Sequence, residues 1–410
     1  MLVHLKEAFR SGYPKQFWVL FFGTIIIRTG SSMIWPFTIN YVSDKLDVAM
    51  AMAAVLLTIR SLSSVVSSFV AGPIADSVGR KTVMILGILG YIFTYLGMVA
   101  VNSMAGFVLV MVFGGLVEPL FRVGVDAILV DLIPEEKRID AYSVNRMAQN
   151  IGVAMGPGIG GALMATSYDL ALFLAASAMS IFLLLLLVGV RETIAEKVPL
   201  AESLNRTALF SGYQRVFRDQ RFMQSTLLII TATMGFSMVW TLSATYTRDV
   251  LGISEAYYGW LPATNALMVI TLQLLFTQFT KRFSLLRAMA IGCAVYVVSI
   301  ASFSVAQNFW WIWGAFVVLT CGEMFYVPST TTFAANLAPQ NMRGRYMSLF
   351  SLHWPIASGL GPLVGGLIND NVGPRWIWIG AALFPLLASF GYARMDRKEK
   401  KGAALESEFA

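Results

Sequence analysis

The stretch GVAMGPGIGG at residues 152–161 returns 205 positions later as ASGLGPLVGG at residues 357–366. In both copies a Gly-Pro pair precedes a Gly-Gly pair at the same spacing. Small residues at every fourth position let the backbones of two helices approach closely in lipid, and proline bends the helix that carries it. The stretch therefore predicts two equivalent packing helices, one in each half of the chain.

Rarer residues share this offset of 205, so the repeat extends over both halves. The single-residue pairs are Trp35 and Trp240, Tyr41 and Tyr246, Asp44 and Asp249, Glu118 and Glu323, Pro134 and Pro339, and Arg138 and Arg343. Two homologous halves of this kind indicate a pseudo-two-fold axis along the membrane normal, with a substrate site between them near the bilayer midplane.

The composition indicates a membrane protein with many spans. Hydrophobic residues make up 57% of the 410 positions and charged residues 13%, about half the charged share of a soluble domain. Disordered, collagen-like and disulfide-rich classes are excluded, and the two cysteines lie in apolar stretches. A nucleic-acid partner is also excluded, because the basic residues behind the net charge of +7 occupy short loops rather than one face.

Twelve apolar segments are long enough to cross about 30 Å of hydrocarbon as helices. They are residues 17–42, 49–74, 82–101, 104–131, 139–167, 169–190, 222–247, 255–279, 286–306, 309–337, 344–369 and 375–394. We therefore expect an all-α integral membrane fold of twelve transmembrane helices in two pseudo-symmetric six-helix bundles, at 1–190 and 222–394. Residues 191–221 form a cytoplasmic linker, and the charged tail at 395–410 is expected to be disordered.

Lysine and arginine predict the orientation. The alternate loops that include both termini hold 23 of the 30 basic residues, and the opposite loops hold three. This bias places both termini in the cytoplasm, with the chain in a bacterial cytoplasmic membrane. The four remaining basic residues lie inside predicted spans, namely Arg28, Arg60, Arg122 and Arg146.

Three carboxylates inside the spans are candidates for proton coupling. Glu118 and Asp126 share one face of the fourth span with Arg122, and Glu323 occupies the repeat position of Glu118 in the tenth. Charges at this depth are costly and rarely face lipid. For Glu118 the sequence leaves open a buried ion pair, with Arg122 or Arg28, and a role in transport. Glu323 has no cation in its own span and is the stronger candidate for a proton carrier.

Other polar and aromatic residues inside the spans are candidates for substrate binding. Arg28 and Arg60 suit either counter-ions for Glu118 or Asp126, or an anionic substrate. Tryptophans inside spans suit either packing or ring contacts with flat or cationic ligands. The candidate substrate-binding residues are Arg28, Trp35, Arg122, Asn145, Trp240, Glu323 and Trp354.

Three motifs resemble the major facilitator superfamily, and within it the twelve-span drug/proton antiporters. They are GPIADSVGRKT at residues 72–82, GVAMGPGIGG at 152–161 and GEMFYVPS at 322–329. The resemblance implies that Asp76 caps a helix starting near residue 343, that Arg80 pairs with Asp131, and that this latch joins the two halves. Pro73 and Gly79 favour a tight turn there. Some related antiporters carry an acid where Asn145 stands. The candidate gating residues are Asp76, Arg80, Asp131, Gly156, Pro157, Gly361 and Pro362.

The resulting prediction is a proton-coupled exporter of amphipathic small molecules that works by alternating access. The alternative is a carrier for one anionic metabolite or lysolipid, motivated by Arg28, Arg60 and Arg122. A sensor or scaffold would need a larger extra domain. No P-loop, metal-ligand cluster or nucleophilic triad is found in the sequence, so we expect no enzyme activity, metal or cofactor. Expected partners are the substrate, protons and the lipid bilayer, and a monomer is sufficient.

Overall fold

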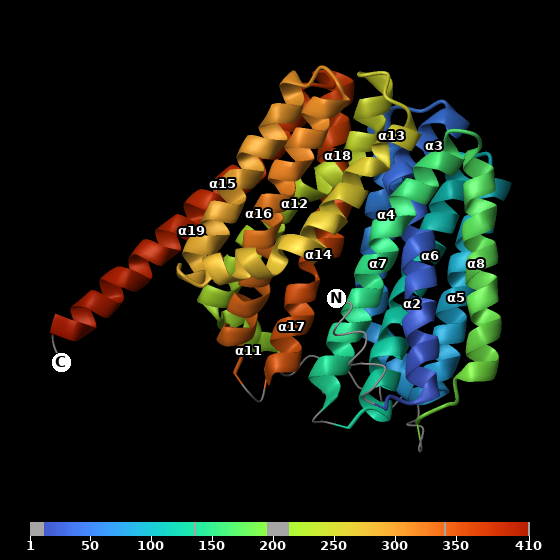
Figure 1. Ribbon diagram of the computed structural model, residues 1–410, viewed down its shortest axis with the longest axis horizontal. Coiled ribbons are helices and arrows are strands. Elements are labelled where there is room, and N and C mark those ends of the chain that lie inside the picture. Colours follow the sequence, from blue (N-terminus) through green and yellow to red (C-terminus); the bar gives the residue numbers. More distant parts are fainter. Residues whose placement is uncertain (1–11, 135–136, 195–212, 340–341, 409–410) are drawn as a thin grey trace. The chain divides into compact units, whose positions relative to one another are not determined.

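The computed structural model describes residues 12–134, 137–194, 213–339 and 342–408, and these residues form helices and no strands (Figure 1). They divide into two compact units. Unit 1 comprises residues 12–48, 55–194 and 253–266, and unit 2 comprises residues 49–54, 213–252 and 267–408. The chain passes from unit 1 to unit 2 between residues 194 and 213, inside the predicted linker.

Unit 1 contains the helices of the first six predicted spans. They are α2 (Lys15–Ile34) with η1 (Trp35–Phe37) and α3 (Thr38–Leu46), α4 (Met50–Val78), α5 (Arg80–Ala100), α6 (Met104–Leu132), α7 (Arg138–Met164) and α8 (Tyr168–Gly189). The short helix α13 (Glu255–Tyr258) and the first residues of α14 also belong to this unit, whereas α4 begins in unit 2.

Unit 2 contains the helices of the last six predicted spans. They are α11 (Tyr213–Arg218) and α12 (Gln220–Asp249), most of α14 (Trp260–Thr280), α15 (Leu285–Ser302) with η3 (Phe303–Val305), α16 (Phe309–Leu337), α17 (Arg343–Ser351), α18 (His353–Asn371) and α19 (Trp376–Glu408). Across the described parts of both units, nine helical segments are long and apolar enough to cross a membrane.

The glycine faces of the repeat pack in the same way in both units. In unit 1 the hydroxyl of Ser32 on α2 donates to the carbonyl of Gly152 on α7 at 3.1 Å. In unit 2 the hydroxyl of Ser237 on α12 donates to the carbonyl of Ala357 on α18 at 2.8 Å. Both residues of the second contact lie 205 positions after their counterparts, so the predicted close packing of these helices is confirmed, and the repeat extends to single hydrogen bonds.

A second repeated contact joins a tyrosine to the end of a neighbouring helix. The hydroxyl of Tyr41 donates to the carbonyl of Met98 at 2.9 Å, and that of Tyr246 donates to the carbonyl of Phe303 at 3.2 Å. In unit 1 the ammonium of Lys45 also donates to the Met98 carbonyl, at 3.0 Å. In unit 1 these bonds satisfy a carbonyl in the last turn of α5, where a helix leaves its carbonyls without intrahelical partners.

The helices differ from the prediction at several places. Pro73 lies inside α4 instead of forming the turn that follows it. The eighth span is divided at Gly259, and the eleventh at Leu352. The tail predicted to be disordered is helical as far as Glu408. An (i, i+4) ion pair between Lys400 and Asp396 stabilises this extension.

Candidate functional site

The turn between α4 and α5 carries the first predicted ion pair. Gly79 forms this one-residue turn with a φ of 112°, a conformation that a residue with a Cβ atom rarely adopts. It is followed by Arg80, which forms an ion pair with Asp131 at the end of α6. The pairing expected from the family motif is therefore present.

Glu192 caps the helix that starts at this turn, and the sequence analysis did not identify it. Its two carboxylate oxygens accept hydrogen bonds from the backbone N–H groups of Arg80 and Lys81, at 3.0 and 3.1 Å. The next residue, Thr193, donates its hydroxyl hydrogen to Asp131 at 2.5 Å. The start of the predicted linker is thus bound to both partners of the ion pair. A carboxylate also interacts favourably with the positive N-terminal end of a helix.

Replacing Glu192 by Gln should lower the free energy of unfolding by about 1 kcal/mol, because the amide group of Gln presents a donor to a backbone donor. Thermal melting in one detergent measures the change. The matched control is Glu399→Gln, which removes an exposed glutamate paired with Arg221 and should cost less. Equal melting temperatures for Glu192→Gln and wild type would contradict the capping role.

The other predicted gating residues lie on these helices. Asp76 is exposed in the last turn of α4, and its capping of a distant helix stays a prediction. Gly156 packs against Ser32 and Met33 of α2, and Gly361 packs against Ser237 and Met234 of α12. Pro157 and Pro362 lie inside α7 and α18 and are buried.

One ion pair in unit 1 connects α4 and α6. The guanidinium of Arg60 donates to a carboxylate oxygen of Glu118 at 3.2 Å, and the two side chains are 17% and 40% exposed. The sequence left Arg122 and Arg28 open as ion-pair partners of Glu118, and Arg28 and Arg60 as counter-ions for either Glu118 or Asp126. The structure selects Arg60, because α4 and α6 bring it to the carboxylate. Tyr91 on α5 lies within electrostatic range of Glu118.

A second group of charges in unit 1 surrounds Asp126. Arg122 precedes it by one turn of α6, and both Arg122 and Arg28 act electrostatically on its carboxylate. Arg28 also donates to the side-chain oxygen of Gln149 on α7 at 3.5 Å. Arg28 therefore lies among polar groups of two neighbouring helices, while Arg122 and Asp126 are themselves exposed.

Two predicted substrate-binding residues of unit 1 have different surroundings. Asn145 is 3% exposed, and its side-chain oxygen accepts a hydrogen bond from the hydroxyl of Thr24 at 3.3 Å. This contact joins α7 to α2, so Asn145 has a packing role whether or not it contacts a substrate. Trp35 is half-buried in the 3₁₀ turn η1 that follows α2.

In unit 2 two of the predicted tryptophans belong to one aromatic cluster, and the predicted carboxylate acts electrostatically on a tyrosine of that cluster. The ring centroid of Phe236 lies 6.0 Å from that of Trp240, 6.3 Å from that of Trp354 and 5.1 Å from that of Tyr296. Glu323 on α16 lies within electrostatic range of Tyr296. Trp240 is buried, whereas Trp354 is 38% exposed. A carboxylate beside such rings suits a flat or cationic ligand.

The family model of the major facilitator superfamily matches residues 20–356, and a second match covers residues 226–409. The chain belongs to the major facilitator superfamily. It is therefore a membrane transport protein, as the repeat and the motif at residues 72–82 predicted. The predicted all-α membrane fold is confirmed.

Three relatives in this superfamily match nearly the whole chain. The uncharacterized transporter YqjV of Bacillus subtilis is 25% identical over 94% of this chain and 95% of its own. A Na(+), Li(+), K(+)/H(+) antiporter of Planococcus maritimus is 27% identical, over 91% and 94%. The quinolone resistance protein NorA of Staphylococcus aureus is 23% identical, over 90% and 94%.

A solved structure of a POT family transporter in complex with 5-aminolevulinic acid has the same fold. Its TM-score is 0.77 at 16% sequence identity, with 94% of this chain and 97% of that chain covered. At this identity the likeness concerns the fold alone.

Proposed function

We propose that this superfamily member is a proton-coupled exporter of amphipathic or cationic small molecules. The observation that carries the proposal is the aromatic cluster of unit 2, where Glu323 lies within electrostatic range of Tyr296. The rings of Trp240 and Trp354 in this cluster offer apolar and cation–π contacts. A carboxylate attracts the same cation and, once protonated, no longer does so. One residue can therefore link substrate binding to proton binding.

The relatives agree with this direction of transport. One is named as an antiporter that exchanges alkali cations for protons, and another is named for quinolone resistance. The first name supports exchange against protons, and the second supports a drug-like substrate. We propose that this chain also exchanges its substrate for protons. The substrate class, amphipathic or cationic small molecules, is inferred from the aromatic cluster of unit 2.

The proposed mechanism is alternating access in a bacterial cytoplasmic membrane, with both termini in the cytoplasm and a monomer as the working unit. Protonation of Glu323 from outside permits the return to the inward-open state, and substrate arriving from the cytoplasm favours release of the proton. Each elementary charge that moves inward along a membrane potential of 100 mV supplies about 2.3 kcal/mol. No enzymatic step and no cofactor is needed, because the gradient supplies the free energy.

A carrier for an anionic metabolite or lysolipid has less support. It needs arginines whose charge is available to the substrate. The charge of Arg60 is offset by Glu118 at 3.2 Å, and those of Arg28 and Arg122 act on Asp126. The charges of these three arginines are thus partly offset by two carboxylates, so only a small excess of positive charge is available to an anionic substrate.

Ethidium flux in liposomes tests the proposal. We expect purified protein in acid-loaded vesicles to accelerate ethidium uptake, and a pH indicator in the lumen to report alkalinisation at the same time. A protonophore should abolish both signals. Protein-free vesicles of the same lipid provide the control for ethidium that crosses the bilayer unaided.

Three outcomes would contradict the proposal. Ethidium uptake that proceeds equally without a pH gradient would exclude proton coupling. Proton movement driven by a lysophospholipid and not by ethidium would favour the anionic carrier. Proton movement driven by Na⁺ or K⁺ alone would instead give this chain the activity named for the Planococcus relative.

A further inference from the structure

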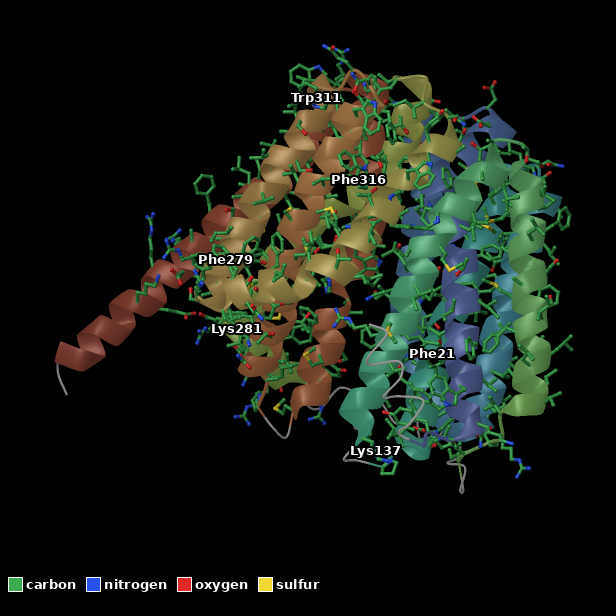
Figure 2. All side chains as sticks on the ribbon, in the orientation of Figure 1. Phe21, Lys137, Phe279, Lys281, Trp311 and Phe316 are labelled. Carbon is green, nitrogen blue, oxygen red and sulfur yellow. The ribbon has the colours of Figure 1, made fainter. Side chains whose placement is uncertain are left out.

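One end of unit 2 carries a concentration of exposed cations. Helix α19 continues beyond its last buried aromatic residue, Tyr392, and in Figure 1 it extends from the bundle as a single red helix. The loop between α14 and α15 lies at the same end, where Figure 2 labels Lys281, opposite the end that carries Trp311. We call the following seven exposed side chains the basic end: Lys281, Arg282, Arg287, Arg394, Arg397, Lys398 and Lys400.

The two carboxylates at this end whose side chains the structure describes, Asp396 and Glu399, are already bonded inside the protein. Asp396 is buried and accepts hydrogen bonds from Ser284 and from Lys400, the latter at 2.6 Å. Glu399 forms an ion pair with Arg221 of α12. Within the described part of the chain, Lys400 is the one member of the basic end that forms an ion pair with a carboxylate. Six cations remain for an external anion, although Arg287 also acts electrostatically on Asp396.

Two of these cations are held against aromatic rings. The guanidinium of Arg282 lies 5.6 Å from the ring centroid of Phe279, and that of Arg287 lies 5.5 Å from that of Phe283. Phe279 belongs to the last turn of α14 and is 47% exposed. An exposed aromatic ring of a membrane helix belongs in the apolar phase, and the guanidinium beside it reaches the polar boundary. That boundary is the depth of the phosphate groups of phospholipids.

At the turn of unit 1 that is equivalent to the loop between α14 and α15, both cations are bonded inside the protein. Arg80 is paired with Asp131, and the ammonium of Lys81 donates to the carbonyl of Leu187 at 2.8 Å. The residue 205 positions after Asp131 is the neutral Asn336. At this turn the cations are therefore bonded within unit 1, whereas in unit 2 Lys281 and Arg282 form no ion pair with a described carboxylate.

We propose that the basic end of unit 2 binds the phosphate headgroups of anionic phospholipids. Each lysine or arginine near an anionic membrane surface contributes about 1 kcal/mol to such binding. A lipid fits better than a soluble anion, because its acyl chains cover the exposed ring of Phe279 while its phosphate meets Arg282. The inference is independent of the substrate that the protein transports.

Native mass spectrometry of the full-length protein tests this site with phosphatidylglycerol as the probe and phosphatidylcholine as the neutral reference. Two double variants address its two sides: Arg282→Gln with Arg287→Gln, and Arg397→Gln with Lys398→Gln. We expect each to weaken phosphatidylglycerol retention by about tenfold or more and to leave phosphatidylcholine unchanged. The matched control is Arg215→Gln with Arg218→Gln, which removes two exposed cations of α11 and should change retention less than twofold.

Three results would overturn the proposal. Wild-type retention in both double variants would exclude the site, and an equal loss in the control would mean that net charge alone attracts the lipid. Displacement of the lipid by soluble glycerol phosphate at equal concentration would show that a free phosphate suffices. Thermal melting of each variant verifies that it is folded. The two double variants change different segments of the chain, so if one of them fails to fold, the other still tests the site.

Discussion

Gly156→Leu and Gly361→Leu are expected to destabilise the protein more than any other single substitution considered for these helices. A Cβ atom at residue 156 would approach the hydroxyl oxygen of Ser32 and lie 2.7 Å from the backbone nitrogen of Met33. Backbone atoms cannot rotate away, so α2 and α7 must separate. Overpacking typically costs about 1–3 kcal/mol, and we expect the upper end of that range here.

Because of the repeat, we expect Gly156→Leu and Gly361→Leu to lose a similar amount of stability. At residue 361 the added Cβ would lie 2.5 Å from the Ser237 hydroxyl oxygen and 2.7 Å from the Met234 carbonyl oxygen. Gel filtration of detergent extracts measures the folded fraction, and thermal melting measures the stability of what remains. The control is Gly158→Leu, on the same helix as Gly156, where an added Cβ meets nothing within 4 Å. Equal yields for the residue 156 and 158 variants would contradict the packing argument.

The spans could be predicted because they depend on composition along the chain. The tenth span was predicted at 309–337 and α16 occupies Phe309–Leu337. Apolar length and flanking polar residues suffice for such a prediction. The two breaks at Gly259 and Leu352 do not change local composition, so hydropathy carries no signal for them.

Partners of charged residues were harder to predict, because they depend on how helices are rotated about their axes. Arg60 and Glu118 are separated by 58 positions, and the spacing along α6 favoured the nearer Arg122 instead. Glu192 lies in a segment that reads as a charged linker, and only the tertiary structure brings it to the N-terminus of α5. Arg80 and Asp131 were expected to pair because the resemblance to the superfamily implied that contact.

The aromatic cluster of unit 2 could be predicted in part. Trp240 and Trp354 were identified as candidates because they lie inside predicted spans, and Glu323 because it occupies the repeat position of Glu118. Phe236 and Tyr296 connect these residues. No feature of the sequence distinguishes them from the other aromatic residues in a chain with 28 phenylalanines and 14 tyrosines. A carboxylate in an apolar span was therefore a stronger signal than the rings around it.

Glu118→Gln and Glu323→Gln should have different effects on transport, although the two glutamates are equivalent in the repeat. Each lies within electrostatic range of an equivalent tyrosine, Tyr91 or Tyr296. The first has Arg60 as an ion-pair partner at 3.2 Å. The residue 205 positions after Arg60 is Asn265, so the repeat supplies no arginine at that position in the second half. The carboxylate of Glu118 is therefore already engaged in an ion pair.

We therefore expect Glu323→Gln to reduce ethidium-driven proton flux to that of protein-free vesicles. Glu118→Gln should retain coupling and lower the free energy of unfolding by about 1 kcal/mol, because it leaves the Arg60 charge without its partner in a half-exposed site. Adding Arg60→Gln to it should restore part of that stability. Equal flux in wild type and Glu323→Gln under one proton gradient would remove Glu323 as the proton carrier. Loss of coupling in Glu118→Gln alone would transfer that role to the first repeat, where the ion pair with Arg60 would then have to open during each cycle.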